Sequence, residues 1–129
     1  MWIFDTTFVI DLFRHEGGAL KKAEEVDSIP STKAISVVTA HEVLRGLFYI
    51  GNEQKLRSGE AALSRFEIIP YTYEIAKKAA EIDASLAKRG EMLPFPDVVI
   101  AATAIVYDLT LVTRDEHFKR IKGLKVEDY

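Results

Sequence analysis

Short apolar runs alternate along this chain with longer segments in which apolar residues recur at helical spacing. The clearest helical pattern places Ile75, Ala79, Ile82 and Leu86 at i, i+4, i+7 and i+11, and Gly90 follows as a stop signal. Further helices are expected to end near residue 13 and to cover residues 19–28, 39–50, 53–65 and 96–107, with a short one after residue 115. In the first of these helices four side chains are expected to be buried: Val9, Ile10, Leu12 and Phe13. The apolar stripe of the helix 39–50 consists of Val43, Leu44, Leu47 and Phe48. Strands are expected at the short apolar runs 2–4, 34–36, 67–70 and 110–113.

This alternation of strands and helices predicts the fold class. Short apolar strands separated by helices are typical of a parallel sheet that is covered on both faces. We therefore expect a three-layer α/β/α sandwich with a short parallel sheet. A length of 129 residues suits one hydrophobic core, so residues 1–129 are expected to form a single domain. Ligands bind such sheets at the carboxyl ends of the strands, which makes the residues directly after each strand the first candidates for function.

Composition excludes several classes of protein. Apolar residues make up 48% and charged residues 29% of the chain, which is typical of neither a disordered tail nor a membrane protein. The longest apolar stretch, residues 98–107, is about half of the ~20 residues that span a bilayer. No secretory signal is visible, so a cytoplasmic location is expected. The absence of cysteine excludes disulfides, thiolate metal sites and thiol nucleophiles.

The charge balance bears on nucleic-acid binding. A net charge of −3 and a pI of about 5.6 argue against broad electrostatic binding of nucleic acid, but they permit a local basic rim. Arg14, Arg45, Arg114 and Lys119 are near the acidic motifs in sequence and are candidates for contacts with phosphate, although ordinary solvated charges explain them equally well. Asp11 is expected to be exposed to solvent.

Four acidic residues lie where strands give way to helices. Asp5 follows the first strand, Glu42 lies early in the helix after the second, Asp97 lies in the first turn of an apolar helix, and Asp115 follows the strand 110–113. Each has a structural alternative. Asp5 and Asp115 suit helix N-caps, Asp97 suits a helix N-terminus, and Thr39-x-x-Glu42 has the spacing of a capping box.

Taken together, these acids point to a metal site. The connectivity places Asp5 and Asp115 at one edge of the sheet, and helices that return to this edge can bring Glu42 and Asp97 beside them. Carboxylates gathered in one cleft repel each other and titrate abnormally unless a cation holds them. Oxygen ligands of this kind suit Mg²⁺ or Mn²⁺, and such ions activate water for phosphodiester hydrolysis. The sequence thus predicts metal-dependent phosphodiester hydrolysis, provided that the four acids meet.

The same motifs resemble those of PIN domains, and more narrowly those of VapC-type toxins of prokaryotic toxin–antitoxin pairs. The matching segments span the whole chain in the order found in the family, and no acid of the family's quartet is missing. These segments are a hydrophobic run before Asp5-Thr6-Thr7, then Thr39-x-x-Glu42-x-x-x-Gly46, Asp97-x-x-Ile100-Ala101-Ala102-x-Ala104 and Leu111-Val112-Thr113-x-Asp115-x-x-Phe118.

This resemblance implies an endoribonuclease whose acidic pocket holds Mg²⁺ or Mn²⁺. By the same likeness, Asp5 and Asp97 are the expected metal ligands, with Asp115 as a further ligand or an outer-shell acid. Glu42 completes the pocket, and Thr113 orients the acids through its hydroxyl. All five side chains are therefore expected to serve catalysis.

The resemblance also implies partners: an RNA substrate, a second copy of the chain, and a small VapB-like antitoxin. The helix 39–50, with Leu44, Leu47 and Phe48, offers hydrophobic surface for contact with a second copy, which favours a homodimer. The alternative, in which all these side chains are interior, stays open. The acid cluster is a receptor for an arginine fork, so an antitoxin peptide is expected to compete with metal or RNA at Asp5 and Asp97.

Two other functions stay open at this stage. One is a PIN fold that is retained for dimerisation or partner docking without catalysis. The other is a phosphatase of the haloacid dehalogenase type, but this chemistry needs a second Asp two positions after Asp5, where Thr7 stands. Glycine-rich nucleotide motifs and a serine nucleophile elbow are absent. His15, His41 and His117 lack metal-ligand spacing and are expected at the surface.

Overall fold

A computed structural model of the protein describes all 129 residues. Its centre is one sheet of five strands in the order β3-β2-β1-β4-β5, and every neighbouring pair is parallel. The predicted α/β fold with a parallel sheet is thus confirmed. The strands are β1 (Trp2–Phe4), β2 (Lys33–Ser36), β3 (Glu67–Ile69), β4 (Thr110–Val112) and β5 (Val126–Glu127).

Six α-helices and one short 3₁₀ helix connect the strands. They are α1 (Thr6–Phe13), α2 (Gly17–Asp27), α3 (Val37–Ile50), α4 (Glu53–Leu63), α5 (Tyr73–Lys88), α6 (Phe95–Val106) and the 3₁₀ helix η1 (Glu116–Arg120). Helix α3 begins earlier than predicted, because the Ser36 hydroxyl accepts the Val38 N–H at 3.1 Å and caps the helix there. The capping-box alternative for Thr39 and Glu42 is therefore wrong.

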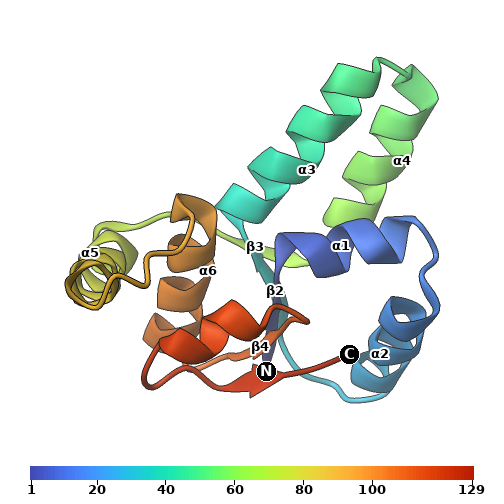
Figure 1. The fold of residues 1–129 in the computed structure, drawn as a ribbon. Coiled ribbons are helices and arrows are strands. Elements are labelled where there is room, and N and C mark those ends of the chain that lie inside the picture. The colour runs from blue at the N-terminus through green and yellow to red at the C-terminus, as the bar shows by residue number, and fades with distance from the viewer.

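The core lies on both faces of the sheet, because successive side chains of each strand point to opposite faces. Ile3 and Leu111 belong to a hydrophobic cluster formed with α5 and α6. Phe4 and Val112 belong to a second cluster formed with α1, α2 and the α3–α4 pair. Figure 1 shows α5 and α6 on one side of the strands and α1 and α2 on the other. This arrangement gives the expected three layers.

Helices α3 and α4 form an antiparallel hairpin that projects from the rest of the molecule (Figure 1). Gly51 ends α3 in the left-handed conformation, with φ of 73°. Val43 of the apolar stripe is buried, but Phe48 is 65% exposed, so the alternative in which all side chains of this stripe are interior is wrong. The reason is that the end of the hairpin reaches beyond the body of the protein and meets no other element.

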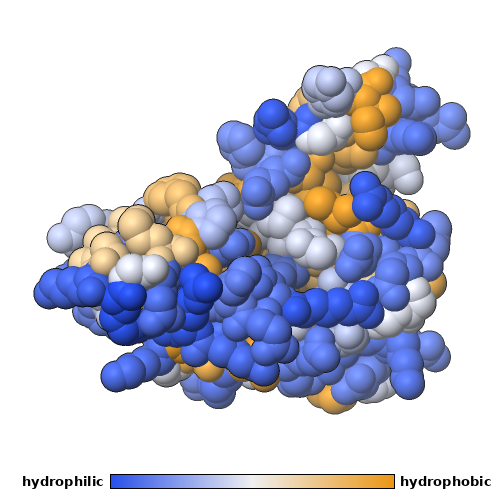
Figure 2. Space-filling model, viewed as in Figure 1, coloured by the Kyte–Doolittle hydropathy of each residue, from blue (hydrophilic) through white to orange (hydrophobic).

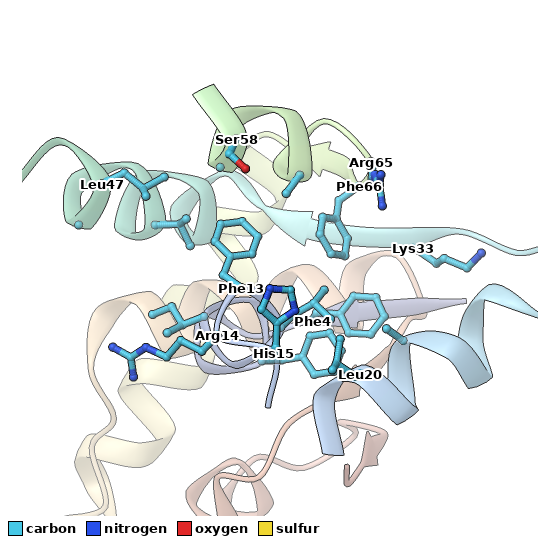
Figure 3. A pocket seen from close by; sticks show the side chains of 18 of the residues that line it. Phe4, Phe13, Arg14, His15, Leu20, Lys33, Leu47, Ser58, Arg65 and Phe66 are labelled. Carbon is cyan, nitrogen blue, oxygen red and sulfur yellow. The ribbon is translucent and has the colours of Figure 1, made fainter. Parts of the chain in front are cut away.

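A groove of about 980 Å³ separates the hairpin from α1 and α2. Figure 2 shows hydrophobic surface in the hollow where the hairpin meets the body, and Figure 3 shows Phe13, Leu20, Leu47 and Phe66 on its walls. Along α1 we predicted four buried side chains, of which only Val9 is fully buried. The other three, which are half-buried because they line the groove, are Ile10, Leu12 and Phe13.

Within the structure, no helix has both the length and the apolar character that crossing a membrane requires.

Candidate active site

The strand order creates a crevice at the carboxyl ends of β1 and β4. From β1 the chain builds outward through β2 and β3 on one side, and β4 and β5 then lie on the other side. Loops that leave β1 and β4 therefore part in opposite directions, and this switch point is where open α/β sheets bind ligands. Asp5 directly follows β1, and Thr113 and Asp115 follow β4.

Asp5 is fixed at this crevice by two hydrogen bonds. Its Oδ1 accepts the Phe8 N–H at 2.8 Å, which caps α1, and its Oδ2 accepts the Thr113 hydroxyl at 2.5 Å. Burial raises the pKa of Asp5, and the charges of Asp115 and Asp11 add to this effect, although the bonds from Thr113 and Phe8 oppose it. Asp5 thus caps α1, as the structural alternative predicted. It also lies at the edge of the sheet where a ligand would bind, so the cap does not exclude a role in the site.

Thr113 and Asp115 form the turn after β4. The Thr113 side chain is 2% exposed, and its oxygen accepts the Asp115 N–H at 3.0 Å while its hydroxyl donates to Asp5. Asp115 in turn caps η1 by accepting the His117 N–H at 2.9 Å, and His117 Nδ1 lies 3.1 Å from Asp115 Oδ1. His117 is exposed, as predicted, but its contact with Asp115 was not expected, because a sequence motif does not show which surface side chains touch.

Glu42 is positioned by two threonines for which the sequence predicted no role. The Thr6 hydroxyl donates to Glu42 Oε1 at 2.6 Å and lies 3.1 Å from the hydroxyl oxygen of the fully buried Thr39. These contacts join the first turn of α1 to α3. The only signal in the sequence was that Thr6 directly follows Asp5 and that Thr39 stands three residues before Glu42.

Asp97 completes the group from the first turn of α6. Burial raises its pKa to about 6, and the charges of Asp115, Asp5 and Glu42 contribute to this increase, whereas His117 acts in the opposite direction. The structure thus brings the four predicted acids and Thr113 to one end of the sheet, near enough for their charges to interact.

The side chains present fit a hard divalent cation. Every candidate ligand is a carboxylate oxygen, and the mutual repulsion seen at Asp97 is what a bound cation would relieve. No group of three or more His, Asp or Glu side chains is close enough to hold a metal ion as it stands. Mg²⁺ does not need such a cage, because it usually keeps several waters and is held by one or two carboxylates.

The predicted basic rim is only partly available for contacts with phosphate. Arg114 lies 3.1 Å from Glu16, and Lys119 lies 2.7 Å from Glu116. Arg14 and Arg45 are exposed and form no ion pair. Solvent exposure of Asp11 is a wrong prediction, because the carboxylate is 21% exposed and accepts the hydroxyl of Tyr129 at 2.6 Å. A contact across 118 positions of sequence has no local signal.

The fold and the site define the class of this protein: an α/β protein with a parallel sheet and four carboxylates at its switch point. Comparison with known proteins identifies the family. The PIN domain family model matches residues 2–124. The chain is 34% identical to Ribonuclease VapC1 of Methanocaldococcus jannaschii over 129 residues, which cover 98% of this chain and 86% of that protein. It is 32% identical to the tRNA(fMet)-specific endonuclease VapC of Salmonella typhimurium over 101 residues, 77% of this chain and 76% of that protein.

A solved structure gives the same result. In VapBC2 from Rickettsia felis, bound to a DNA fragment from its promoter, one chain superimposes with a TM-score of 0.88 at 26% identity, covering 99% of this chain and 98% of that one. The chain belongs to the PIN domain family and, within it, to the VapC group. The predicted resemblance is therefore confirmed, and the phosphatase alternative is excluded.

Proposed function

We propose that this protein is a metal-dependent endoribonuclease of the VapC kind that hydrolyses phosphodiester bonds of single-stranded RNA. The observation that carries the proposal is the group of four carboxylates at the switch point, where burial, together with the charges of Asp115, Asp5 and Glu42, raises the pKa of Asp97 to about 6. Carboxylates gathered in one cleft are typical of a functional site, and a bound cation would offset their mutual repulsion. The ribonuclease names of its relatives support the same activity.

In this proposal Asp5 and Asp97 hold Mg²⁺ or Mn²⁺, and Asp115 serves as a further ligand or as an outer-shell acid. The bound ion would supply a nucleophilic water at neutral pH and stabilise negative charge on the phosphate. Thr113 and the Phe8 N–H keep Asp5 in one orientation. Thr6 occupies Oε1 of Glu42, which leaves Oε2 free to accept a hydrogen bond from the attacking water. The water oxygen bonds to phosphorus, the bond from phosphorus to the leaving oxygen breaks, and that oxygen takes up a proton.

Incubation of the purified protein with single-stranded RNAs of varied sequence tests this activity. We expect internal cleavage in Mn²⁺ or Mg²⁺, loss of cleavage in EDTA, and recovery when Mn²⁺ is added in excess. A protein that binds RNA or partner proteins but cleaves none of the RNAs under any of these conditions would instead be the non-catalytic module that the sequence left open.

An antitoxin is the partner that we propose for the groove between the hairpin and helices α1 and α2. The groove is lined mainly by apolar side chains, and Glu42 also lines it, so the groove reaches the acidic site at this residue. A peptide with an apolar face can bury that face in the groove while its arginine reaches the carboxylates. The solved VapBC2 complex from Rickettsia felis supports a VapB-like protein as this partner.

We expect a VapB-like peptide that carries one arginine to inhibit RNA cleavage and to weaken Mn²⁺ binding at Asp5 and Asp97. Loss of a bidentate ion pair at a desolvated site should reduce the inhibition by about tenfold or more when the arginine is changed to methionine. Titration of cleavage rate against peptide at two Mn²⁺ concentrations measures the competition. A peptide that binds tightly and leaves cleavage unchanged would contradict the prediction.

We also propose that the protein is a homodimer. At the end of α3, Phe48, Tyr49 and Ile50 are 65%, 90% and 60% exposed, and such a patch favours contact with a second copy. Light scattering at micromolar concentration should therefore give twice the 14.5 kDa mass of the chain. The double substitution Phe48→Ser and Ile50→Ser should shift the mass toward the monomer. A stable monomer of the unsubstituted protein would rule the dimer out.

A further inference from the structure

Arg114 stands between two residues of the candidate site, and its side chain is held from several directions. Its Nη1 lies 3.1 Å from Glu16 Oε2 and 4.0 Å from Asp11 Oδ2. Its Nε donates to the backbone oxygen of Tyr129 at 2.8 Å, and its guanidinium carbon lies 4.1 Å from the centre of the Tyr129 ring. We call Arg114 with Glu16, Asp11 and Tyr129 the Arg114 clamp.

Tyr129 connects this clamp to α1. Its hydroxyl donates to Asp11 Oδ2 at 2.6 Å, and its ring meets the Phe8 ring edge-on, with centroids 4.8 Å apart. The backbone N–H of Phe8 is the group that binds Asp5 Oδ1. One aromatic side chain thus contacts the helix that fixes Asp5 and also the arginine next to Thr113.

The N-terminus of α2 is shaped to receive the arginine. Glu16 caps this helix by accepting the N–H groups of Gly18 at 2.7 Å and Ala19 at 3.1 Å. A Cβ atom at Gly18 would lie 2.1 Å from Arg114 Nη2 and 3.3 Å from both carboxylate oxygens of Glu16. Gly17, the preceding residue, has nothing within 4 Å of such an atom. An alanine at position 18 therefore requires the guanidinium to shift from its place beside Glu16, whereas an alanine at position 17 does not.

We propose that the Arg114 clamp holds the turn Thr113–Asp115 in place, so that Arg114 and Tyr129 are positioning residues of the acidic site. The Thr113 oxygen contacts both Asp5 Oδ2 and the Asp115 N–H, and the Arg114 backbone joins Thr113 to Asp115. A displacement of Arg114 therefore changes the spacing of two acids at once. Mutation of a residue that orients metal ligands without binding the metal itself commonly lowers metal affinity or activity by about 10- to 100-fold. This inference rests on the proposed function.

The substitution Gly18→Ala tests the clamp from outside it, with Gly17→Ala as the matched control. Alanine favours a helix over glycine, so a merely structural role predicts an unchanged or higher melting temperature and unchanged chemistry. The clamp predicts that Gly18→Ala displaces the guanidinium, weakens Mn²⁺ binding about tenfold and lowers kcat about 10- to 100-fold, with KM changed much less. Gly17→Ala should match the unsubstituted protein. Calorimetric Mn²⁺ titration and RNA cleavage rates give the two readouts.

The substitution Arg114→Met tests the same clamp from its centre. Its control is Arg57→Met, because Arg57 is 77% exposed and pairs only with Glu53 on the same helix. Arg114→Met should show the same two losses, and Arg114→Lys should restore only part of them, since lysine lacks the planar fork. Both readouts are taken on samples whose circular dichroism matches that of the unsubstituted protein.

The outcomes separate the two proposals. If the unsubstituted protein binds Mn²⁺ and cleaves RNA, and Gly18→Ala does both equally well, the clamp has no positioning role and the proposed function stands. If the unsubstituted protein neither binds Mn²⁺ nor cleaves RNA, the proposed function fails and this inference fails with it. Loss of both properties in Gly18→Ala but not in Gly17→Ala supports the clamp.

Discussion

Replacement of Asp97 by asparagine is expected to reduce RNA cleavage by at least about 100-fold while the fold is retained. Asparagine keeps the shape of the side chain and removes the charge that would hold the cation. Loss of about 3 kcal/mol of transition-state stabilisation corresponds to this factor. Steady-state cleavage of a labelled single-stranded RNA by the purified variant measures it, and circular dichroism checks that the helices are intact.

The same substitution should not destabilise the protein in the absence of metal. Burial and the neighbouring acids raise the pKa of Asp97 to about 6, which means that its ionised form is unfavourable in the folded state. Asparagine removes this cost, so we expect an equal or higher melting temperature above pH 7. Asp83→Asn on α5 is the matched control, because this carboxylate forms no ion pair. Cleavage by Asp97→Asn at the unsubstituted rate would contradict the role of Asp97.

Mn²⁺ is expected to raise the melting temperature, and the increase should grow with the logarithm of the Mn²⁺ concentration above the Kd. At a concentration 100 times the Kd, a ligand of the folded state adds about 2.7 kcal/mol to the free energy of unfolding. For a chain of this length, that corresponds to roughly 10 °C. A thermal scan with Mn²⁺ against EDTA measures the shift, and Asp97→Asn should lose most of it. An unchanged melting temperature on addition of Mn²⁺ would indicate that the acids do not bind metal.

The stabilisation by metal should also depend on pH. Because the pKa of Asp97 rises from 3.8 to about 6 on folding, the folded state binds more protons than the unfolded state between these values. Without metal, the contribution of Asp97 to the free energy of unfolding therefore falls as the pH rises from about 4 to about 6, and then levels off. Protons compete with Mn²⁺ for the carboxylate, so the shift in melting temperature should be small at pH 5 and full above pH 7. An equal shift at both pH values would contradict this competition.

The spacing of apolar residues predicted most helices and strands correctly, because it reflects which face of a single element is buried. The four apolar positions from Ile75 to Leu86 predict α5, and all of them are buried against α6 and the sheet. The same reasoning fails at Phe48 and at Phe13. Periodicity identifies an apolar face but not what covers it, and here one side chain extends beyond the body while the other lines a groove.

The hydrogen-bond partners of the site had no such local signal. Asp5 and Asp115 were equally well explained as helix caps, and both do cap helices. Thr6 was visible only as part of a motif, although its hydroxyl holds Glu42. A carboxylate can cap a helix and still be part of the candidate site, so the structural and the functional explanation do not exclude each other. Only the contacts between elements show that both can hold.

The sequence by itself determined the order of strands and helices, the fold class and the four acids at strand-to-helix transitions, because each of these depends on residue spacing along one segment. The tertiary structure decided which atoms meet: Thr113 with Asp5, Thr6 with Glu42, and Arg114 with Tyr129. These pairs come from segments far apart in the chain. Their contacts arise only when the helices pack on the sheet, and the packing of whole elements, rather than any local preference, fixes them.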